Sequence, residues 1–371
     1  MDFAFSDEQE ELRRIVRSFL QTTSPETEVR RLMDTELGFD PAVWQRMGAE
    51  LGLQGLAIPE EYGGAGCGMV ELGVALEEMG RALLCAPFLA SAVLATTALV
   101  RSTDASLRKL LLPGLAAGEI VGAFALTEDS ARWDRKGVTT TARPDADHWT
   151  LSGHKNFVLD GCAADFILTV AAAPDGIGVF YVDQTAPGLH VTPLPTLDQT
   201  RRQARLEYQD VPAERVQIDG DGWQFVTDVL DRAAVALAAE QVGVAAQALD
   251  TAVEYAKTRR QFGRSIGSFQ AVKHILADVL LELESARAAA QYAMLAADDD
   301  DPGLPAAASL AKAYCSDACL TATQQNVQVH GGIGFTWEHS AHLYLKRAKT
   351  SQLLFGDPAY HRELLAARIG L

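Results

Sequence analysis

Two short segments carry residue types suited to holding a phosphate-bearing ligand. The first, residues 259–264, reads Arg-Arg-Gln-Phe-Gly-Arg and stands between two long helical patterns. Arginine suits a diphosphate because its planar guanidinium gives paired, charge-assisted hydrogen bonds to phosphate oxygens. The second segment ends in Gly331-Gly332, where a ligand could approach the backbone closely. On spacing alone, a basic surface turn explains the first segment as well as ligand binding does, and a helix C-cap explains the glycines.

The two segments together resemble known sequence elements. Residues 328–335, QVHGGIGF, resemble a signature of the acyl-CoA dehydrogenase flavoproteins, and residues 255–270 are similar to that family's Arg-x-x-Phe-Gly…Gln element. The resemblance covers essentially the whole chain and implies FAD as the cofactor. In the family, these elements reach across a subunit interface and hold the adenosine-diphosphate end of a neighbour's flavin. The residues that the resemblance assigns to this role are Arg259, Phe262, Gln270, Gln328, Gly331 and Gly332.

The segment that should carry the catalytic base departs from the family. The family reads roughly Gln-hydrophobic-aromatic-Glu-Gly-Thr, whereas residues 352–357 read Gln-Leu-Leu-Phe-Gly-Asp, so Phe355 stands in the place of the glutamate. The family's reaction removes a proton alpha to a thioester carbonyl while hydride leaves the beta carbon for flavin N5. It needs a carboxylate within hydrogen-bonding reach of the alpha carbon. Phenylalanine cannot accept that proton.

Other positions offer only weak replacements for this base. Some relatives place the glutamate on the first long C-terminal helix, where this chain has Ala233. Glu240 lies two turns further along and shares roughly that face, so it is a candidate base, with a structural carboxylate as the alternative. Asp357 lies two residues past the expected site and precedes Pro358. The catalytic base is therefore unassigned.

The residues expected to hold the chain's own flavin ring are largely replaced. Residues 125–134, ALTEDSARWD, resemble the family's Leu-Thr-Glu-Pro-x-x-Gly-Ser-Asp, in which Thr127 is implied to contact the cofactor. Asp129 takes the place of the proline, and Arg132-Trp133 replaces Gly-Ser. The larger pair adds volume where flavin and CoA approach the backbone, and it removes a hydroxyl.

The next elements show the same losses. Phe157 replaces the tryptophan that shields the ring, and Leu159 replaces the threonine that hydrogen-bonds flavin N5. Asp231 matches a residue near the CoA pantetheine, but its usual arginine companion is Ala234. Residues donated to a neighbour's flavin persist, while those serving the chain's own site are mostly gone.

Three zones of the chain would position these residues. Residues 1–118 read as an N-terminal α-helical domain that opens with a capping box at Ser6 and Gln9. Residues 119–219 alternate with period two between turns and predict a central antiparallel β-barrel or sandwich. Residues 220–371 predict a C-terminal four-helix bundle. The expected fold is therefore a multidomain α+β architecture, which the resemblance also implies.

Composition narrows the class of partner. The chain has 371 residues and a formal net charge of −17, which disfavours nucleic acid and anionic membranes. Leu83–Val100 carries no charge, but Pro87 and several hydroxyl residues make a buried helix the better interpretation than a membrane span. The acidic N-terminus lacks a signal peptide's basic region, so a cytoplasmic protein is expected. Cys315 and Cys319 fit buried thiols, and no metal site is predicted.

Three functions are compatible with this pattern. The first is a subunit of a hetero-oligomeric acyl-CoA dehydrogenase, whose partner supplies the base and the flavin-ring pocket. Split enzymes of this kind are known in the family for bulky steroid-type acyl-CoA thioesters. The second is a self-sufficient homotetrameric flavoenzyme, a dimer of dimers, with a displaced base or different chemistry. The third is a non-catalytic scaffold.

Overall fold

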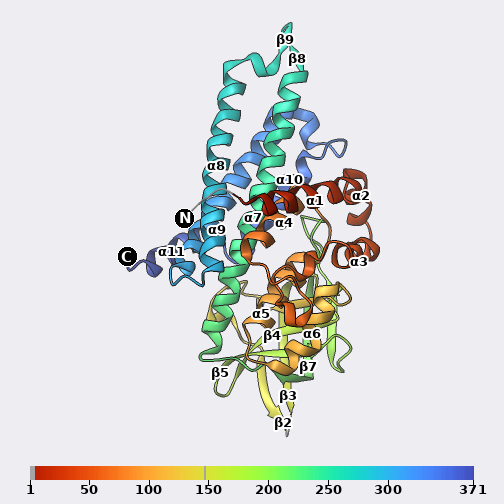
Figure 1. The fold of residues 1–371 in the computed structure, drawn as a ribbon, viewed down its shortest axis with the longest axis vertical. Helices are drawn as coiled ribbons and strands as arrows, with labels where there is room; N and C mark the ends of the chain where they lie inside the picture. The colour runs from red at the N-terminus through yellow and green to blue at the C-terminus, as the bar shows by residue number, and fades with distance from the viewer. Residues whose placement is uncertain (1–4, 146–147) are drawn as a thin grey trace. The chain divides into compact units, whose positions relative to one another are not determined.

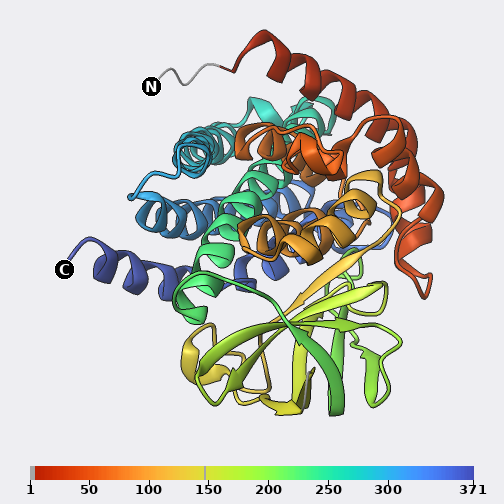
Figure 2. The same cartoon turned by 60° about the horizontal axis from the view of Figure 1, so that its bottom comes forward.

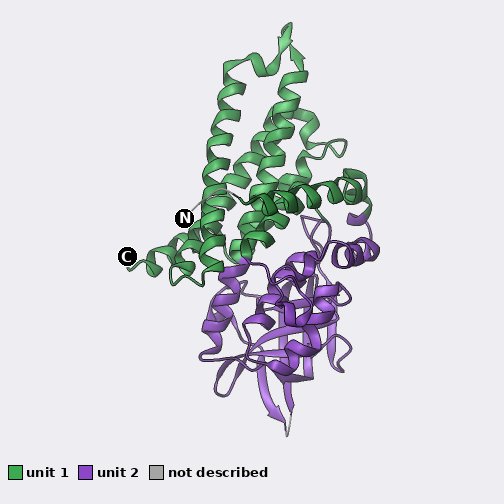
Figure 3. Ribbon diagram, in the orientation of Figure 1, with its two compact units in different colours: residues 1–31, 69–84, 234–371 green, residues 32–68, 85–233 purple. Residues whose placement is uncertain are grey.

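The structure is a computed structural model that describes residues 5–145 and 148–371. It contains two compact units that interleave along the chain (Figure 3). Unit 1 comprises residues 1–31, 69–84 and 234–371, and unit 2 comprises residues 32–68 and 85–233. Residues 146–147, within the zone expected to form the β-barrel, lie outside the described residues, as do the first four residues of the chain. The three-zone division of the sequence remains a prediction.

A seven-stranded β-sheet forms the centre of unit 2 (Figure 2). Its strands are β1 (Gly122–Ala125), β2 (Thr141–Asp145), β3 (His148–Leu159), β4 (Phe166–Ala173), β5 (Gly176–Asp183), β6 (Leu189–Pro193) and β7 (Gln203–Arg215). The order is β1-β4-β2-β3-β7-β5, and β5 pairs back onto β4, which closes the sheet into a barrel. The interior is apolar and includes Leu151, Ile167, Phe180, Leu206 and Val211.

The pairing is mostly but not wholly antiparallel. Strands β1 and β2 both pair with β4 in parallel, the second through Thr141 and Ala172. Strand β2 contains Pro144, so its sequence is a weaker strand signal than those of the other strands in this sheet. Proline cannot donate to a ladder and so weakens the strand pattern. The mixed α+β architecture with a central barrel is confirmed.

Short helices complete the N-terminal part. They are α1 (Asp7–Thr23), α2 (Glu26–Met33), α3 (Pro41–Ala49), α4 (Met69–Arg81), α5 (Thr96–Arg101) and α6 (Ala105–Ala117), with a π-helical segment η3 (Leu89–Ala95). The capping box that opens α1 is present, because Ser6 accepts from the Gln9 amide and Gln9 accepts from the Ser6 amide. Segment η3 is buried throughout. Among the described residues, no helix combines the length and apolar character needed to cross a membrane.

Long helices dominate unit 1. They are α8 (Gln270–Asp298), α9 (Leu304–His330), α10 (Ala341–Leu353) and α11 (Pro358–Arg368), together with the part of α7 (Gly222–Thr258) that begins at Ala234. Helix α4 crosses α7 very closely at Gly243, where a Cβ would lie 1.8 Å from the carbonyl oxygen of Glu77. Any larger residue at this crossing would push the helices apart.

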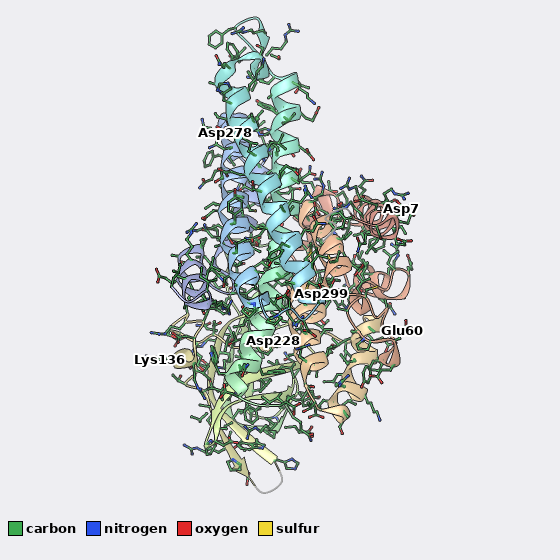
Figure 4. The ribbon with its side chains drawn as sticks, turned by 60° about the vertical axis from the view of Figure 1, so that its left-hand side comes forward. Asp7, Glu60, Lys136, Asp228, Asp278 and Asp299 are labelled. Atoms are coloured by element: carbon green, nitrogen blue, oxygen red, sulfur yellow. The ribbon has the colours of Figure 1, made fainter. Side chains whose placement is uncertain are left out.

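A two-stranded hairpin, β8 (Arg260–Gln261) with β9 (Arg264–Ser265), connects α7 to α8 at their far ends (Figure 1). Asp278 lies on α8 towards this hairpin, whereas Asp299 caps the opposite end of the helix (Figure 4). The hairpin therefore projects from two long, rigid supports.

Candidate functional site

The hairpin presents cationic groups that the described part of the chain leaves without acidic partners. Arg259 and Arg260 are exposed, and no carboxylate within residues 5–145 and 148–371 pairs with either. Phe262 is 90% exposed with φ +51°, a conformation unusual for a bulky residue. Phe269 supports the hairpin from below, because the Arg264 guanidinium lies 4.0 Å from its ring centroid and the Phe262 ring packs edge-on against it. Phe269 therefore supports the hairpin, while Arg259 and Arg260 stay available to bind a ligand.

The end of α9 has a similar openness. Gly331 adopts φ +65° and ψ −140° at the helix C-cap, a combination that glycine adopts far more readily than other residues. A Cβ on Gly331 or Gly332 would meet no atom within 4 Å, so the backbone is accessible from that side. Gln328 is exposed one turn earlier. The helix-cap interpretation is therefore correct, and it leaves room for a ligand.

An aromatic stack links α7 to α9. The buried His330 ring lies 4.3 Å from the Tyr255 ring and 4.2 Å from the His339 ring, measured between centroids. Tyr255 precedes Arg259 by one helical turn, so the stack fixes the start of the hairpin relative to the glycine pair. The sequence analysis missed this contact, because residues so far apart in the chain give no local pattern.

Phe355 is buried in the turn between α10 and α11. Its side chain is 4% exposed, and its backbone has φ +61°. The position that holds a base in the family is therefore apolar here and carries backbone strain.

The two candidate carboxylates have structural partners. Glu240 Oε1 lies 2.7 Å from Arg347 Nη1, and both side chains are 4% exposed. Arg347 also donates to the carbonyl oxygen of Leu84. Asp357 accepts from the amide of Tyr360 and caps α11. These contacts favour the structural interpretation of Glu240, because a carboxylate neutralised by a buried guanidinium is a poor proton acceptor.

In unit 2, loop 127–134 is tied to strand β3 by its own polar groups. Thr127 Oγ1 donates to the Asn156 carbonyl oxygen at 2.7 Å, and the Asn156 amide donates back to the Thr127 carbonyl oxygen. Asp129 accepts from Arg205 Nη1 and Asn156 Nδ2, each at 2.8 Å. Arg132 pairs with Asp134 inside the loop. The hydroxyl of Thr127 therefore already serves the protein.

A buried ion pair lies beneath this loop. Lys155 Nζ is 2.8 Å from Glu128 Oε1, and neither residue is more than 3% exposed. Burial lowers the pKa of Lys155 to about 8 despite the attraction of Glu128. Burial alone would raise the pKa of Glu128, but Lys155 and hydrogen bonds from Thr139 and Thr140 lower it to about 2. Both groups are charged at neutral pH.

The remaining predicted residues fall along β3 and α7. Phe157 is 42% exposed with φ +59°, whereas Leu159 is buried. Asp231 is buried on α7 within unit 2, and Ala234 is buried where unit 1 begins. Within unit 1 the stack of Tyr255 on His330 joins the last turn of α7, which precedes the hairpin, to the last turn of α9, which precedes the glycine pair. Within unit 2 it brings together Thr127 and the segment that precedes Phe157.

Comparison with known proteins identifies the family. Three models match the chain: the acyl-CoA dehydrogenase N-terminal domain at residues 6–119, the middle domain at 123–211 and the C-terminal domain at 220–370. The acyl-CoA dehydrogenase IpdE2 of Mycolicibacterium smegmatis is 34% identical over 98% of this chain and 99% of its own length.

Two solved structures share the fold over nearly the whole chain. A structure described as a variant of the Tcur3481-Tcur3483 steroid ACAD has a TM-score of 0.89 at 33% identity, with 98% of each chain covered. The ChsE4-ChsE5 complex from Mycobacterium tuberculosis has a TM-score of 0.92 at 27% identity, covering 100% of this chain and 99% of that one. The chain belongs to the acyl-CoA dehydrogenase family of FAD-dependent oxidoreductases.

Proposed function

We propose that this chain is the base-deficient subunit of a hetero-oligomeric acyl-CoA dehydrogenase and contributes FAD contacts to its partner's site. One observation carries the proposal: a buried phenylalanine, Phe355, stands where the family places its catalytic carboxylate. The carboxylates of Glu240 and Asp357 are engaged by Arg347 and by the first turn of α11. We therefore assign the removal of the proton alpha to the thioester to a group on another chain.

The residues of this chain fit one end of FAD better than the other. Arg259 and the glycine pair expose guanidinium and backbone groups that suit a diphosphate. The loop expected to serve the flavin ring instead directs Thr127 into the protein, and strand β3 carries Leu159 in place of a hydroxyl. When bound, FAD supplies the hydride-accepting chemistry of the family. This chain's part is to hold the diphosphate through Arg259, with Gln270 and Gln328 beside it.

The partner is a second acyl-CoA dehydrogenase subunit that carries the missing carboxylate, with the assembly a dimer of dimers. The two solved relatives whose descriptions pair two names, one of them called a steroid ACAD, support this assembly and a bulky, steroid-type acyl-CoA thioester as substrate. Asp231 is the residue we assign to the CoA arm. Because Ala234 replaces its companion arginine, this chain's own acyl-CoA binding is weakened.

The decisive experiment counts flavin per subunit. The chain is purified alone and after co-expression with an acyl-CoA dehydrogenase subunit that retains the glutamate, and FAD is measured by its visible absorption. We expect a colourless lone chain and about one FAD per two subunits in the complex, which bleaches when an acyl-CoA is added. One FAD per lone chain, bleached by the same thioester, would overturn the proposal. In that event, loss of turnover in Glu240→Gln would identify a displaced base.

The contribution in trans has its own test. Arg259→Ala in the complex should lower FAD content without dissociating the subunits, because it removes a diphosphate contact and touches no packed core. Arg14→Ala is the matched control, since Arg14 is an exposed arginine that pairs with Glu11 on its own helix, α1. Equal FAD content in both variants would exclude the assigned role of Arg259.

A further inference from the structure

The turn that joins α10 to α11 is strained, and residues 354–356 at its centre are buried. Phe355 has φ +61° and Gly356 has φ +105°, so two consecutive residues lie in the region that glycine favours. Glycine adopts it freely, but a left-handed conformation costs a bulky residue about 1–2 kcal/mol. Such strain persists only when the surroundings over-determine the backbone.

Lys312 on α9 supplies one part of these surroundings. Its side chain is fully buried, and Nζ donates to the carbonyl oxygens of Gln352 and Gly356, each at 3.1 Å, and to Ser316 Oγ at 3.0 Å. The three protons of an ammonium group thus meet three acceptors. Two of these are carbonyls around the end of α10, where a cation also complements the helix dipole. A single side chain therefore bonds to one carbonyl before Phe355 in the chain and to one after it.

His361 on α11 holds the carbonyl between them. Its Nε2 lies 3.0 Å from the Phe355 carbonyl oxygen, and its Nδ1 lies 3.4 Å from Ser309 Oγ. Burial, together with the nearby charge of Lys312, lowers the pKa of His361 to about 3. The ring is therefore neutral at physiological pH. Since a carbonyl only accepts, Nε2 carries the proton and Nδ1 accepts from Ser309.

The charge of Lys312 is not balanced by a direct carboxylate contact among the described residues. The titratable groups that act on it are Cys315, Asp317 and Cys319 on its own helix, and Asp357 and His361 from the α11 side. Burial lowers the pKa of Lys312 to about 7. Above that pH the neutral amine keeps two donors and turns a lone pair towards one of its three oxygen partners.

We propose that Lys312 is a positioning residue that holds Phe355 and Gly356 in the left-handed conformation and thereby fixes the direction of the side chain at position 355. His361 assists by fixing the carbonyl of that same residue. We call the contacts of Lys312 and His361 with this turn the clamp. It acts on the turn on which the proposed function depends, but it requires neither a partner subunit nor flavin. Either proposal can therefore fail without the other.

A comparison of glycine with alanine at position 355 reports the backbone directly. Phe355→Gly and Phe355→Ala lose the same buried ring, so their difference reflects the conformation of the residue. With Lys312 present, the glycine variant should melt about 1–3 °C above the alanine variant, because alanine pays for the left-handed region. In a Lys312→Met background the turn can relax, and the order should vanish or reverse, since glycine loses more entropy on folding.

Lys349→Met is the matched control. Lys349 lies on α10 and contacts the side-chain oxygen of Gln352, not its carbonyl, at 2.7 Å. The glycine advantage should survive in that background. A lysine that only fills space would lower the melting temperature of both position-355 variants equally and leave their difference intact. An unchanged difference in Lys312→Met would overturn the proposal.

A pH series covers the case in which Lys312→Met does not fold. In the native-lysine background, the glycine advantage should be largest at pH 6 and should shrink by pH 9 as the ammonium is lost. Hydrogen exchange of the amides of residues 354–357, corrected for its intrinsic pH dependence, should increase over the same interval. The clamp would be contradicted if the difference in melting temperature between the two variants and the corrected exchange rate of residues 354–357 both stayed constant from pH 6 to pH 9.

Discussion

The hairpin at residues 259–265 and the loop at residues 127–134 are both assigned to flavin by resemblance, yet their polar groups are used differently. In the hairpin, exposed arginines have no acidic partner among the described residues. In the loop, Thr127, Glu128 and Asp129 each bond to another part of the protein, and Arg132 pairs with Asp134 within the loop. A group that is already hydrogen-bonded gains little from a ligand, because the new bond must replace an old one. The difference separates residues that can recognise a ligand from residues that now serve the fold.

The largest expected effect tests how far the loop has become structural. Lys155→Met should lower the free energy of unfolding by about 3–5 kcal/mol, because it leaves the Glu128 carboxylate buried without its counter-charge. Urea denaturation measures the loss. Lys136→Met, on an exposed lysine near the same loop (Figure 4), should change stability by less than about 0.5 kcal/mol. If the two variants prove equally stable, the ion pair does not hold the loop.

The dependence of stability on acidic pH tests the same ion pair through Glu128. The pKa of Glu128 is lowered from 4.5 to about 2 in the folded chain, so the unfolded chain binds more protons between these values. The stabilisation is fully present above pH 4.5 and is lost as pH falls towards 2, by about 2–3 kcal/mol in total. The fall in unfolding free energy between pH 6 and pH 3 should be smaller in Glu128→Gln. Parallel pH profiles for the two proteins would count against the pair.

The open region should respond in ligand affinity instead of stability. Arg259→Ala in the assembled complex should weaken FAD binding about tenfold, which corresponds to the loss of a charge-assisted hydrogen bond of about 1.4 kcal/mol. Titration of the apo-complex with FAD gives the dissociation constant, while the melting temperature of the lone chain should stay the same. A lower melting temperature with unchanged affinity would place Arg259 with the structural residues and remove the contrast.

Local sequence patterns predicted the helices and strands well where periodicity and caps act over a few residues. The capping box at Ser6 and Gln9 marks the start of α1, and the expected C-terminal helical zone contains the long helices α7–α9. Asp357-Pro358 is a local start signal for α11, since Asp357 caps the helix and proline occupies its first position. Strand β2 gives a weak signal because it is short and contains proline.

The site was less predictable because its contacts join distant residues. Arg347 reaches Glu240 across 107 positions, and two of the three acceptors of Lys312 are backbone carbonyls 40 and 44 residues away. Carbonyls are present at every residue and leave no sequence signal. A lysine amid small residues in the α9 segment is the sequence feature that indicates a buried polar contact. It does not indicate which groups the lysine contacts. The absence of a base at Phe355 could be seen in the sequence, whereas the structural roles of Glu240 and Asp357 needed coordinates.

The smallest expected effect asks whether the loop is closed by its surface contacts as well as by the buried pair. Asp129 is exposed, and hydrogen bonds from Arg205 and Asn156, together with nearby His154, lower its pKa. Exposed pairs contribute little to global stability because water screens them and ordering the side chains costs entropy. Asp129→Ala should therefore leave the melting temperature almost unchanged while hydrogen exchange in residues 127–134 becomes faster. Because Thr127 and Lys155 would still hold the loop, the Asp129→Ala chain purified alone should remain colourless. If this variant bound FAD, the contacts of Asp129 alone would be what keeps the chain from holding its own flavin. The difference between the loop and the hairpin would then depend on a single carboxylate.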